Sequence, residues 1–179
     1  MLKIIVPGME FYDENKNEFI YYNEQVLQLE HSLVSISKWE SKWCKPFLSG
    51  GDKTTEEIID YVRCMTITQN VKPDVYQRLT ESNIKDINDY IDSPMTATTF
   101  NNFNNSGGRE IITSEIIYYW MVTFNIPFEC QKWHLNRLLT LIRVCNIKNT
   151  PPKKMSKSEI LARNRELNNA RKRQFNTKG

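Results

Sequence analysis

The sequence predicts a mainly α-helical protein of the α+β class, with a small N-terminal β-hairpin element, a compact helical domain and a basic C-terminal helical arm. Within the first 31 residues, apolar and polar side chains alternate as they do in strands. From Ser32 the apolar residues recur every three or four positions, which is the spacing of a helix face. After Pro151-Pro152 the chain is basic and has few apolar residues. We therefore expect three regions, at residues 1–31, 32–149 and 150–179.

Three short stretches predict the N-terminal β-element. Residues 2–6 have the alternation of a strand, and Pro7-Gly8 then turns the chain. The stretches 11–12 and 19–22 flank a polar loop, which is the pattern of a β-hairpin. Residues 26–31 are compatible with a third strand or with the start of a helix, and we favour the strand.

The helical domain begins at Ser32 with a helix that has one apolar face and is ended by Pro46 and the glycines after it. That face consists of Leu33, Ile36, Trp39, Trp43 and Phe47. Thr54 and Glu57 have the spacing of a capping box, in which each side chain bonds the backbone amide of the other. This pair predicts a second helix that fades by residues 68–70.

Two shorter helices and a loop are expected next. Pro73 suits the first turn of a short helix, because its missing amide hydrogen is not needed there. Thr80 or Ser82 begins another helix, which ends before Pro94. Residues 96–108 are rich in Thr, Asn and Gly and read as a loop, either a plain surface excursion or a binding loop.

Two long helices are predicted to close the domain and to form its centre, because they are apolar almost all round. The first begins at Thr113 and is broken at Pro127; the second runs continuously over residues 128–145. Arg137 and Arg143 are expected to stay in solvent. The residues expected to face the core are Cys130, Trp133, Leu138, Leu141, Ile142 and Cys145.

No pattern of residues indicates catalysis or a metal site. His31 and His134 lie far apart in the sequence without a nucleophile motif, so we interpret both as structural. Residues 51–54 end like a phosphate-binding loop but lack its first glycine, and the carboxylates of residues 56–60 are expected to form a solvated helix face. The four cysteines form no Cys-x-x-Cys pair and are expected to be reduced and mostly buried. We therefore expect a protein that is not an enzyme and has no cofactor.

No stretch approaches the roughly 18 uninterrupted apolar residues of a membrane span. The first residues are also unlike a secretory signal. The sequence thus predicts a cytosolic type of protein without a membrane partner.

The charge of the chain is divided unevenly. Residues 148–179 contain ten Lys/Arg and two Asp/Glu, a net charge of +8, whereas residues 1–147 have a net charge of −5. Ser156 and Glu159 predict a capped helix within the basic segment. Its apolar surface is too small to hold it firmly on a domain, so the helix should be marginal in isolation.

This basic arm holds the candidate binding residues. A protein partner, nucleic acid phosphates and a purely solubilising role remain as alternatives. Phe175 is the only aromatic residue of the arm, so base stacking is poorly served and nucleic acid is the less favoured partner. The candidate partner-binding residues are Lys153, Lys154, Lys157, Ile160, Leu161, Arg163, Arg165, Leu167, Arg171, Lys172 and Arg173.

Five segments together suggest a family. They are residues 29–41, 45–47, 109–121, 133–146 and 155–168. In these segments the chain resembles the tail assembly chaperones of tailed bacteriophages, from about residue 26 onward. The resemblance is one of sequence texture and includes no catalytic signature.

The resemblance implies a protein of the infected host's cytoplasm that coats the long tape-measure protein of the phage tail. Such chaperones keep the tape-measure protein soluble until tail-tube subunits polymerise round it. A possible homo-oligomer is compatible with this reading. The alternatives are a minor structural protein of the tail or connector, retained in the virion, and a nucleic-acid-binding adaptor that acts through the basic arm.

Overall fold

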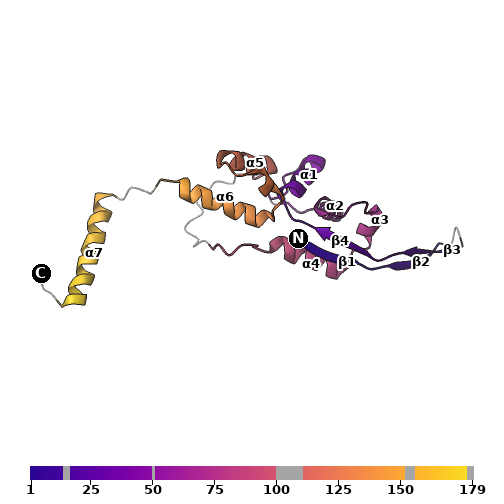
Figure 1. Ribbon diagram of the computed structural model, residues 1–179, viewed down its shortest axis with the longest axis horizontal. Helices are drawn as coiled ribbons and strands as arrows, with labels where there is room; N and C mark the ends of the chain where they lie inside the picture. The colour runs from indigo at the N-terminus through magenta and orange to yellow at the C-terminus, as the bar shows by residue number, and fades with distance from the viewer. Residues whose placement is uncertain (14–16, 50, 100–110, 152–155, 177–179) are drawn as a thin grey trace. The chain divides into compact units, whose positions relative to one another are not determined.

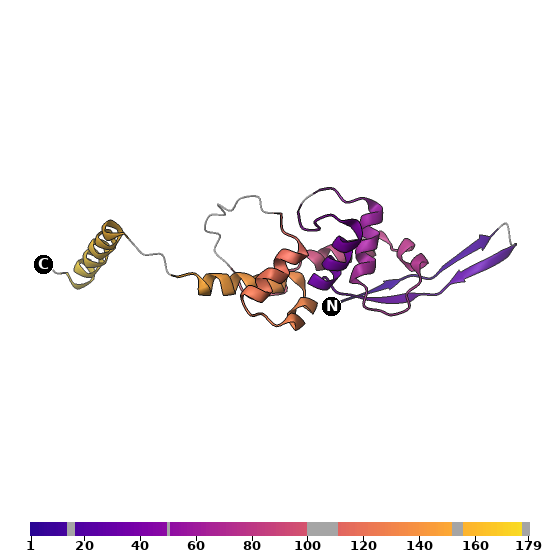
Figure 2. The same cartoon turned by 90° about the horizontal axis from the view of Figure 1, so that it is seen from above.

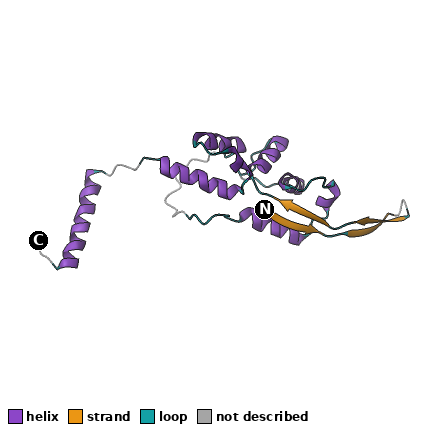
Figure 3. Ribbon diagram, viewed as in Figure 1, coloured by secondary structure: helices purple, strands orange, loops and turns teal. Residues whose placement is uncertain are grey.

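A computed structural model describes residues 1–13, 17–49, 51–99, 111–151 and 156–176. The chain divides into two compact units, Met1–Asn146 and Ile147–Gly179. The first unit contains both the β-strands and the helices that pack on them, as Figures 1 and 3 show. The predicted fold class is confirmed, because the described residues are mainly helical with short antiparallel strand pairs.

The strands form two antiparallel pairs. Strand β1 (Leu2–Val6) pairs with β4 (Gln25–Leu29), which confirms the strand favoured for residues 26–31. Strand β2 (Met9–Asp13) pairs with β3 (Glu18–Tyr22) as the predicted hairpin. In Figure 1 the β2–β3 pair extends the ribbon begun by β1 and β4 beyond the helices.

The junction between the two pairs depends on a glycine and an arginine. A Cβ atom on Gly8 would lie 2.8 Å from the carbonyl oxygen of Tyr22, so only glycine fits this crossing. The Arg78 guanidinium donates to the carbonyl oxygen of Pro7 at 2.7 Å and lies 5.0 Å from the centre of the Tyr22 ring. Because the Arg78 side chain is only 9% exposed, it fixes the base of the hairpin from within the unit.

Helices α1 to α4 begin where the sequence predicts. They span Leu33–Trp43 (α1), Thr55–Met65 (α2), Pro73–Gln77 (α3) and Glu81–Asp92 (α4). Helices α1, α2 and α4 have side-chain caps at Ser32, Thr54 and Thr80, each of which accepts a hydrogen bond from the amide three residues on. Helix α1 ends at Cys44, whose φ of 53° is left-handed, and therefore ends before Pro46.

The continuous helix predicted over residues 128–145 is wrong. After α5 (Ser114–Thr123), the chain forms a short 3₁₀ helix, η1 (Phe128–Lys132), and then α6 (Leu135–Asn149). Trp133 is extended between them, with a ψ of 161°. The break lets His134 form a β-bridge with Ser32 and lets the Leu135 amide donate to the His31 carbonyl at 2.8 Å. These bonds to a distant segment replace the helical bonds that local sequence favours.

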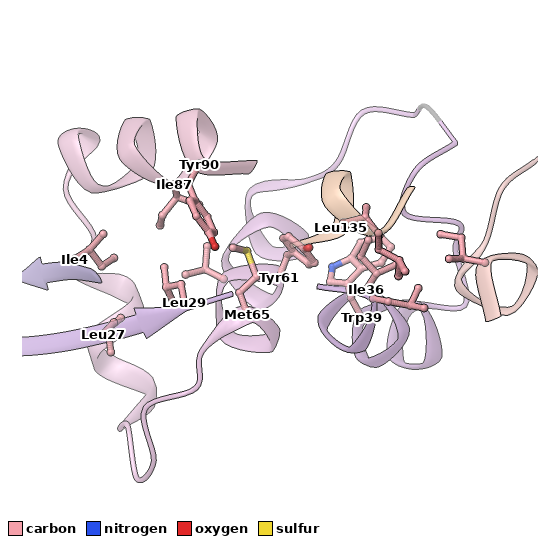
Figure 4. Close-up of a cluster of buried hydrophobic side chains, with 14 of the residues drawn as sticks. Ile4, Leu27, Leu29, Ile36, Trp39, Tyr61, Met65, Ile87, Tyr90 and Leu135 are labelled. Carbon is pink, nitrogen blue, oxygen red and sulfur yellow. The ribbon is translucent and has the colours of Figure 1, made fainter. Parts of the chain in front are cut away.

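The core lies between the inner face of β1–β4 and helices α1, α2, α4, α5 and α6, and Figure 4 shows part of it. Trp39 fills its centre, and its indole donates to the carbonyl oxygen of Glu57 at 2.9 Å. The buried aliphatic residues shared by the β-ribbon and the helices include Ile4, Val6, Leu27, Leu29, Leu33, Ile36, Ile117, Leu135 and Leu138.

The α5–α6 pair is not the centre that the sequence predicted. Tyr119 and Val122 on α5 are 66% and 60% exposed. Leu138 is buried as expected, but Trp133 and Leu141 are only partly buried against the core. A mostly apolar helix therefore lies at the edge of this unit, and the inner face of β1–β4 contributes Ile4, Val6, Leu27 and Leu29 to the core instead.

Two further expectations are corrected or fall outside the described residues. All four cysteines are free, but only Cys130 is buried, whereas Cys44 is exposed and the other two are intermediate. Cys44 is exposed because it ends helix α1 on the surface. Of the predicted loop at 96–108, positions from 100 onward lie outside the described residues.

Candidate partner-binding arm

The candidate site is helix α7 (Lys157–Phe175) of the second unit. Its first turn contains the predicted capping box: the Glu159 amide donates to the Ser156 hydroxyl at 3.3 Å, and the Ser156 amide donates to the Glu159 carboxylate at 2.7 Å. Its last turn is basic, and Asn176 ends it in the left-handed conformation. Acidic residues at the start and basic residues at the end also favour the helix electrostatically.

Every described side chain of α7 is exposed. Ile160, Leu161, Leu167 and Phe175 are 45%, 62%, 46% and 68% exposed, which is unusual for the largest apolar residues of one helix. Exposed apolar residues that gather on one side of a helix mark a surface for binding. Within its own unit, α7 thus leaves these apolar side chains uncovered.

The large apolar residues of α7 share one side with three cations. At 3.6 residues per turn, they lie in an arc of about 140° together with Lys157, Arg171 and Lys172. Glu159 and Glu166, seven residues apart, both lie on the opposite side. One side of α7 is therefore apolar and basic without any acidic group.

The predicted site residues are only partly brought together. Lys153 and Lys154 lie outside the described residues. Arg163 and Arg165 lie just outside the arc, about 40° and 20° beyond its edges, whereas Arg173 lies on the opposite side of α7. The residues that α7 does bring together are Lys157, Ile160, Leu161, Leu167, Arg171 and Lys172, and Phe175 joins them.

The electrostatics of α7 favour an acidic partner. The helix contains six Lys/Arg and two Glu, a net charge of +4. Hydrogen bonds from the Ser156 backbone and then its side chain lower the pKa of Glu159, so this cap stays ionised. The arrangement can bind an acidic, partly apolar surface but contains no group set up for chemistry.

The two histidines, which are about a hundred residues apart in the sequence, lie side by side in the first unit. Their ring centres are 5.2 Å apart, and the side chains are 2% and 5% exposed. His31 Nδ1 is 2.5 Å from the Tyr61 hydroxyl. His134 Nε2 donates to the Tyr90 carbonyl at 2.9 Å, while its Nδ1 accepts from the Asn136 amide at 3.3 Å.

These bonds make the histidine pair a structural connection. Burial, with His134 adding a smaller effect, lowers the pKa of His31 to about 4, so it is neutral at pH 7. Burial also raises the pKa of Tyr61 above its ordinary value. An adjacent cavity of about 360 Å³ is lined by Ser32, Lys38, Cys64 and their neighbours, but neither imidazole is among its lining residues.

Two carboxylates expected on a solvated helix face are instead buried. Glu57 lies 2.5 Å from the Lys45 ammonium, whose hydrogen bond is the main reason that the pKa of Glu57 is lowered. Burial opposes ionisation of Asp60, but hydrogen bonds from Lys42 and Trp43 outweigh it and lower its pKa. The lysines come from the loop and helix end that α2 packs against, which the local sequence could not reveal.

The described residues contain no group of three or more His, Cys, Asp or Glu side chains placed to hold a metal ion. None of the helices in the described ranges combines the length and apolar composition needed to cross a membrane. No protein-family model, no curated protein and no solved structure matches this chain.

The sequence reasoning missed a second exposed surface, the β2–β3 hairpin. Its rings at Phe11, Tyr12, Phe19 and Tyr21 are 43% to 68% exposed. The signal was present, because adjacent aromatic residues in one strand project to opposite faces and a single layer of helices cannot cover both.

Proposed function

We propose that this protein is a non-enzymatic adaptor that acts as a phage tail assembly chaperone and binds the tape-measure protein through α7. One observation carries the proposal: α7 is a capped helix with a combined apolar and basic side, and all its described side chains are exposed. The assignment to phage tail assembly rests on the sequence resemblance, and the host cytoplasm is its expected location.

The side chains of α7 suit a reversible contact with an elongated client. An amphipathic helix binds by laying its apolar residues in a groove, and Ile160, Leu161, Leu167 and Phe175 supply such residues. Their narrow strip limits the area buried, so the contact is weak enough to be displaced. The cations beside them speed encounter with an acidic client and make it sensitive to salt.

A two-plasmid co-expression experiment tests the proposal. The tape-measure protein of the same phage is expressed with the full chain or with residues 1–150, which retain the complete core of the first unit. We expect the full chain to keep the client soluble and the truncated chain to leave it insoluble. If both forms solubilise it equally, α7 is only a solubilising extension.

Matched point variants distinguish client binding by the apolar side of α7 from a general effect of the helix on solubility. Leu161→Ser with Leu167→Ser removes apolar contacts, whereas Ala162→Ser with Asn169→Ser changes the same number of residues outside the apolar arc. We expect only the first pair to release the client. A failure of every form to bind the client would contradict the chaperone proposal and favour a structural role in the virion.

The nucleic-acid alternative makes a different prediction. Binding of a 30-base RNA or DNA probe through α7 would fall steeply with salt, in proportion to the phosphates neutralised. We expect only weak binding near 0.15 M salt. Tight binding at that salt, lost with residues 153–179, would replace the chaperone proposal with a nucleic-acid adaptor.

A further inference from the structure

Both faces of the β2–β3 hairpin carry exposed apolar residues. Met9 and Phe11, at 52% and 45%, lie on the face with Tyr22, and the other face holds the longer run of rings. The register pairs Glu10 with Tyr21 and Tyr12 with Phe19, so these four side chains share one face. The Tyr12 and Phe19 ring centres are 5.0 Å apart, and those of Phe19 and Tyr21 are 6.4 Å apart. With exposures of 43%, 58% and 68%, the three rings form an open aromatic strip beside a carboxylate. We call these four residues the aromatic face.

On the opposite face of the hairpin, an arginine side chain packs on a tyrosine ring. There the guanidinium of Arg78 lies 5.0 Å from the Tyr22 ring centre and bonds the backbone at the hairpin base. Arginine binds aromatic rings favourably because its planar cation stacks on their electron-rich faces. The aromatic face offers the same kind of rings to a cation from outside the unit.

The hairpin is also acidic. Its described residues include Glu10, Asp13 and Glu18 and no Lys, Arg or His, a net charge of −3. Of these carboxylates, Glu10 lies on the aromatic face, whereas Asp13 and Glu18 lie on the opposite face. A partner for this surface must therefore be basic and apolar.

Helix α7 has this complementary composition. Its apolar arc holds Lys157, Arg171 and Lys172 among four large apolar residues and faces away from both of its glutamates. The exposed aromatic residues of the hairpin and the exposed apolar residues of α7 are each poorly accommodated in water. Contact between the two would cover both.

We propose that the aromatic face of the β2–β3 hairpin is the docking surface for helix α7 of a second copy of this chain. Arg171 and Lys172 lie against the rings and near Glu10, while Ile160, Leu161 and Phe175 pack on Tyr12, Phe19 and Tyr21. The contact is heterologous, because hairpin meets arm, so each copy has one donor and one acceptor surface. Such contacts build rings or open chains of copies.

The layout of the first unit favours contact between copies over contact within one. Inside that unit the hairpin projects at one end, whereas α6 leads the chain out toward the other end (Figures 1 and 2). Within the first unit, the end from which the chain continues is therefore opposite the end that carries the hairpin. The client and a second copy would use the same side of α7, so the two contacts exclude each other at one helix. The association test contains no client, and its failure is therefore distinct from a failure of the chaperone function.

Complementary charge reversals in the full chain test the proposal. One variant carries Glu10→Lys on the aromatic face of the hairpin. The other carries Lys157→Glu and Arg171→Glu on α7, at opposite ends, so that their effects on the helix dipole oppose each other. Sedimentation velocity over a range of concentrations measures association, and circular dichroism confirms that each variant is folded.

The wild type should associate as its concentration rises. Each variant alone should have a dissociation constant for association at least about tenfold higher. An equimolar mixture should associate again, because each reversed hairpin then meets an oppositely reversed arm. The control, Asp86→Lys with Asp89→Lys on the exposed side of α4, should behave as the wild type.

Other outcomes overturn the proposal in identifiable ways. If the hairpin variant alone still associates as the wild type does, arms pair with arms. If the arm variant alone does so, hairpins pair with hairpins. A wild type that stays monomeric at every concentration shows either docking of α7 within its own chain or no docking at all.

Discussion

The two strand pairs of this protein have the same size and the same kind of ladder but opposite surroundings. In β1–β4, Ile4, Val6, Leu27 and Leu29 are between 0% and 3% exposed, because helices cover their face. In β2–β3 the corresponding aromatic residues are about half exposed. A sequence in which apolar and polar residues alternate is therefore enough to form a two-stranded ribbon. Whether the apolar side chains of that ribbon are buried depends on what the rest of the molecule, or another copy, packs against them.

The largest effect is expected at the covered pair. Leu29→Ala removes a completely buried side chain and should lower the free energy of unfolding by about 3 kcal/mol. For a chain of this size the thermal midpoint should then fall by roughly 6–12 °C. A thermal melt followed by circular dichroism measures it, and an unchanged midpoint would contradict the burial of this pair.

Lowering the pH should reduce the free energy of unfolding through His31, which follows β4 in the same buried region. The pKa of His31 is lowered from 6.5 to about 4, so the unfolded chain binds a proton that the folded chain refuses in that interval. Stability should therefore fall as the pH is lowered from 7 to 4, by about 3 kcal/mol from this group. Urea unfolding at several pH values measures the effect.

The matched variant for this acid effect is His31→Gln, which cannot titrate. Other groups also titrate near pH 4, so the informative quantity is the difference in pH dependence between wild type and variant. The variant should be less stable at pH 7 but lose less stability on acidification. Equal slopes in the two proteins would show that His31 does not cause the acid sensitivity.

A substitution at the junction between the two strand pairs should destabilise mainly the β2–β3 hairpin. Arg78→Ala removes bonds to Pro7 and the stacking on Tyr22, with an expected cost of about 1–2 kcal/mol. Hydrogen exchange should increase in β2–β3 more than in β1–β4. As a control, Arg137→Ala also removes an arginine from an aromatic ring, that of Trp133 at 4.3 Å, but leaves the ribbon unchanged.

The smallest effect on stability is expected at the exposed pair. Phe19→Ala should change the free energy of unfolding by less than about 0.5 kcal/mol, because the ring is already 58% exposed. The same substitution should weaken association between copies about fivefold or more, since buried aromatic residues dominate protein interfaces. Sedimentation and a urea titration on one sample separate these two outcomes; a large loss of stability without a change in association would refute the comparison.

The parts of the fold that sequence predicted are those set by local chemistry. Thr54, Thr80 and Ser156 begin helices because their hydroxyl groups cap the next turn, and Pro73 begins one because proline fits there. The break at Trp133 was missed because it is stabilised by bonds to His31 and Ser32, far earlier in the chain.

The candidate site was predicted in composition but not in arrangement. The capped basic helix at residues 157–175 followed from Ser156, Glu159 and the charge pattern. Which of its cations lie beside Ile160 and Leu167 follows from helical geometry, once the helix is known to run without a break. The β2–β3 rings are exposed because no other described part of the unit packs over them. The sequence of the two strands alone does not determine whether such a layer is present.

Hydrogen–deuterium exchange of the full chain at low and high protein concentration tests most directly the claim that the exposed ribbon is covered by another copy's arm. We predict that amides in β2–β3 and in α7 gain protection together as the concentration rises, because docking stabilises both against local opening. Amides in β1–β4 should be equally protected at both concentrations. Exchange in β2–β3 that is the same at every concentration, under conditions where the chains associate, would contradict the account.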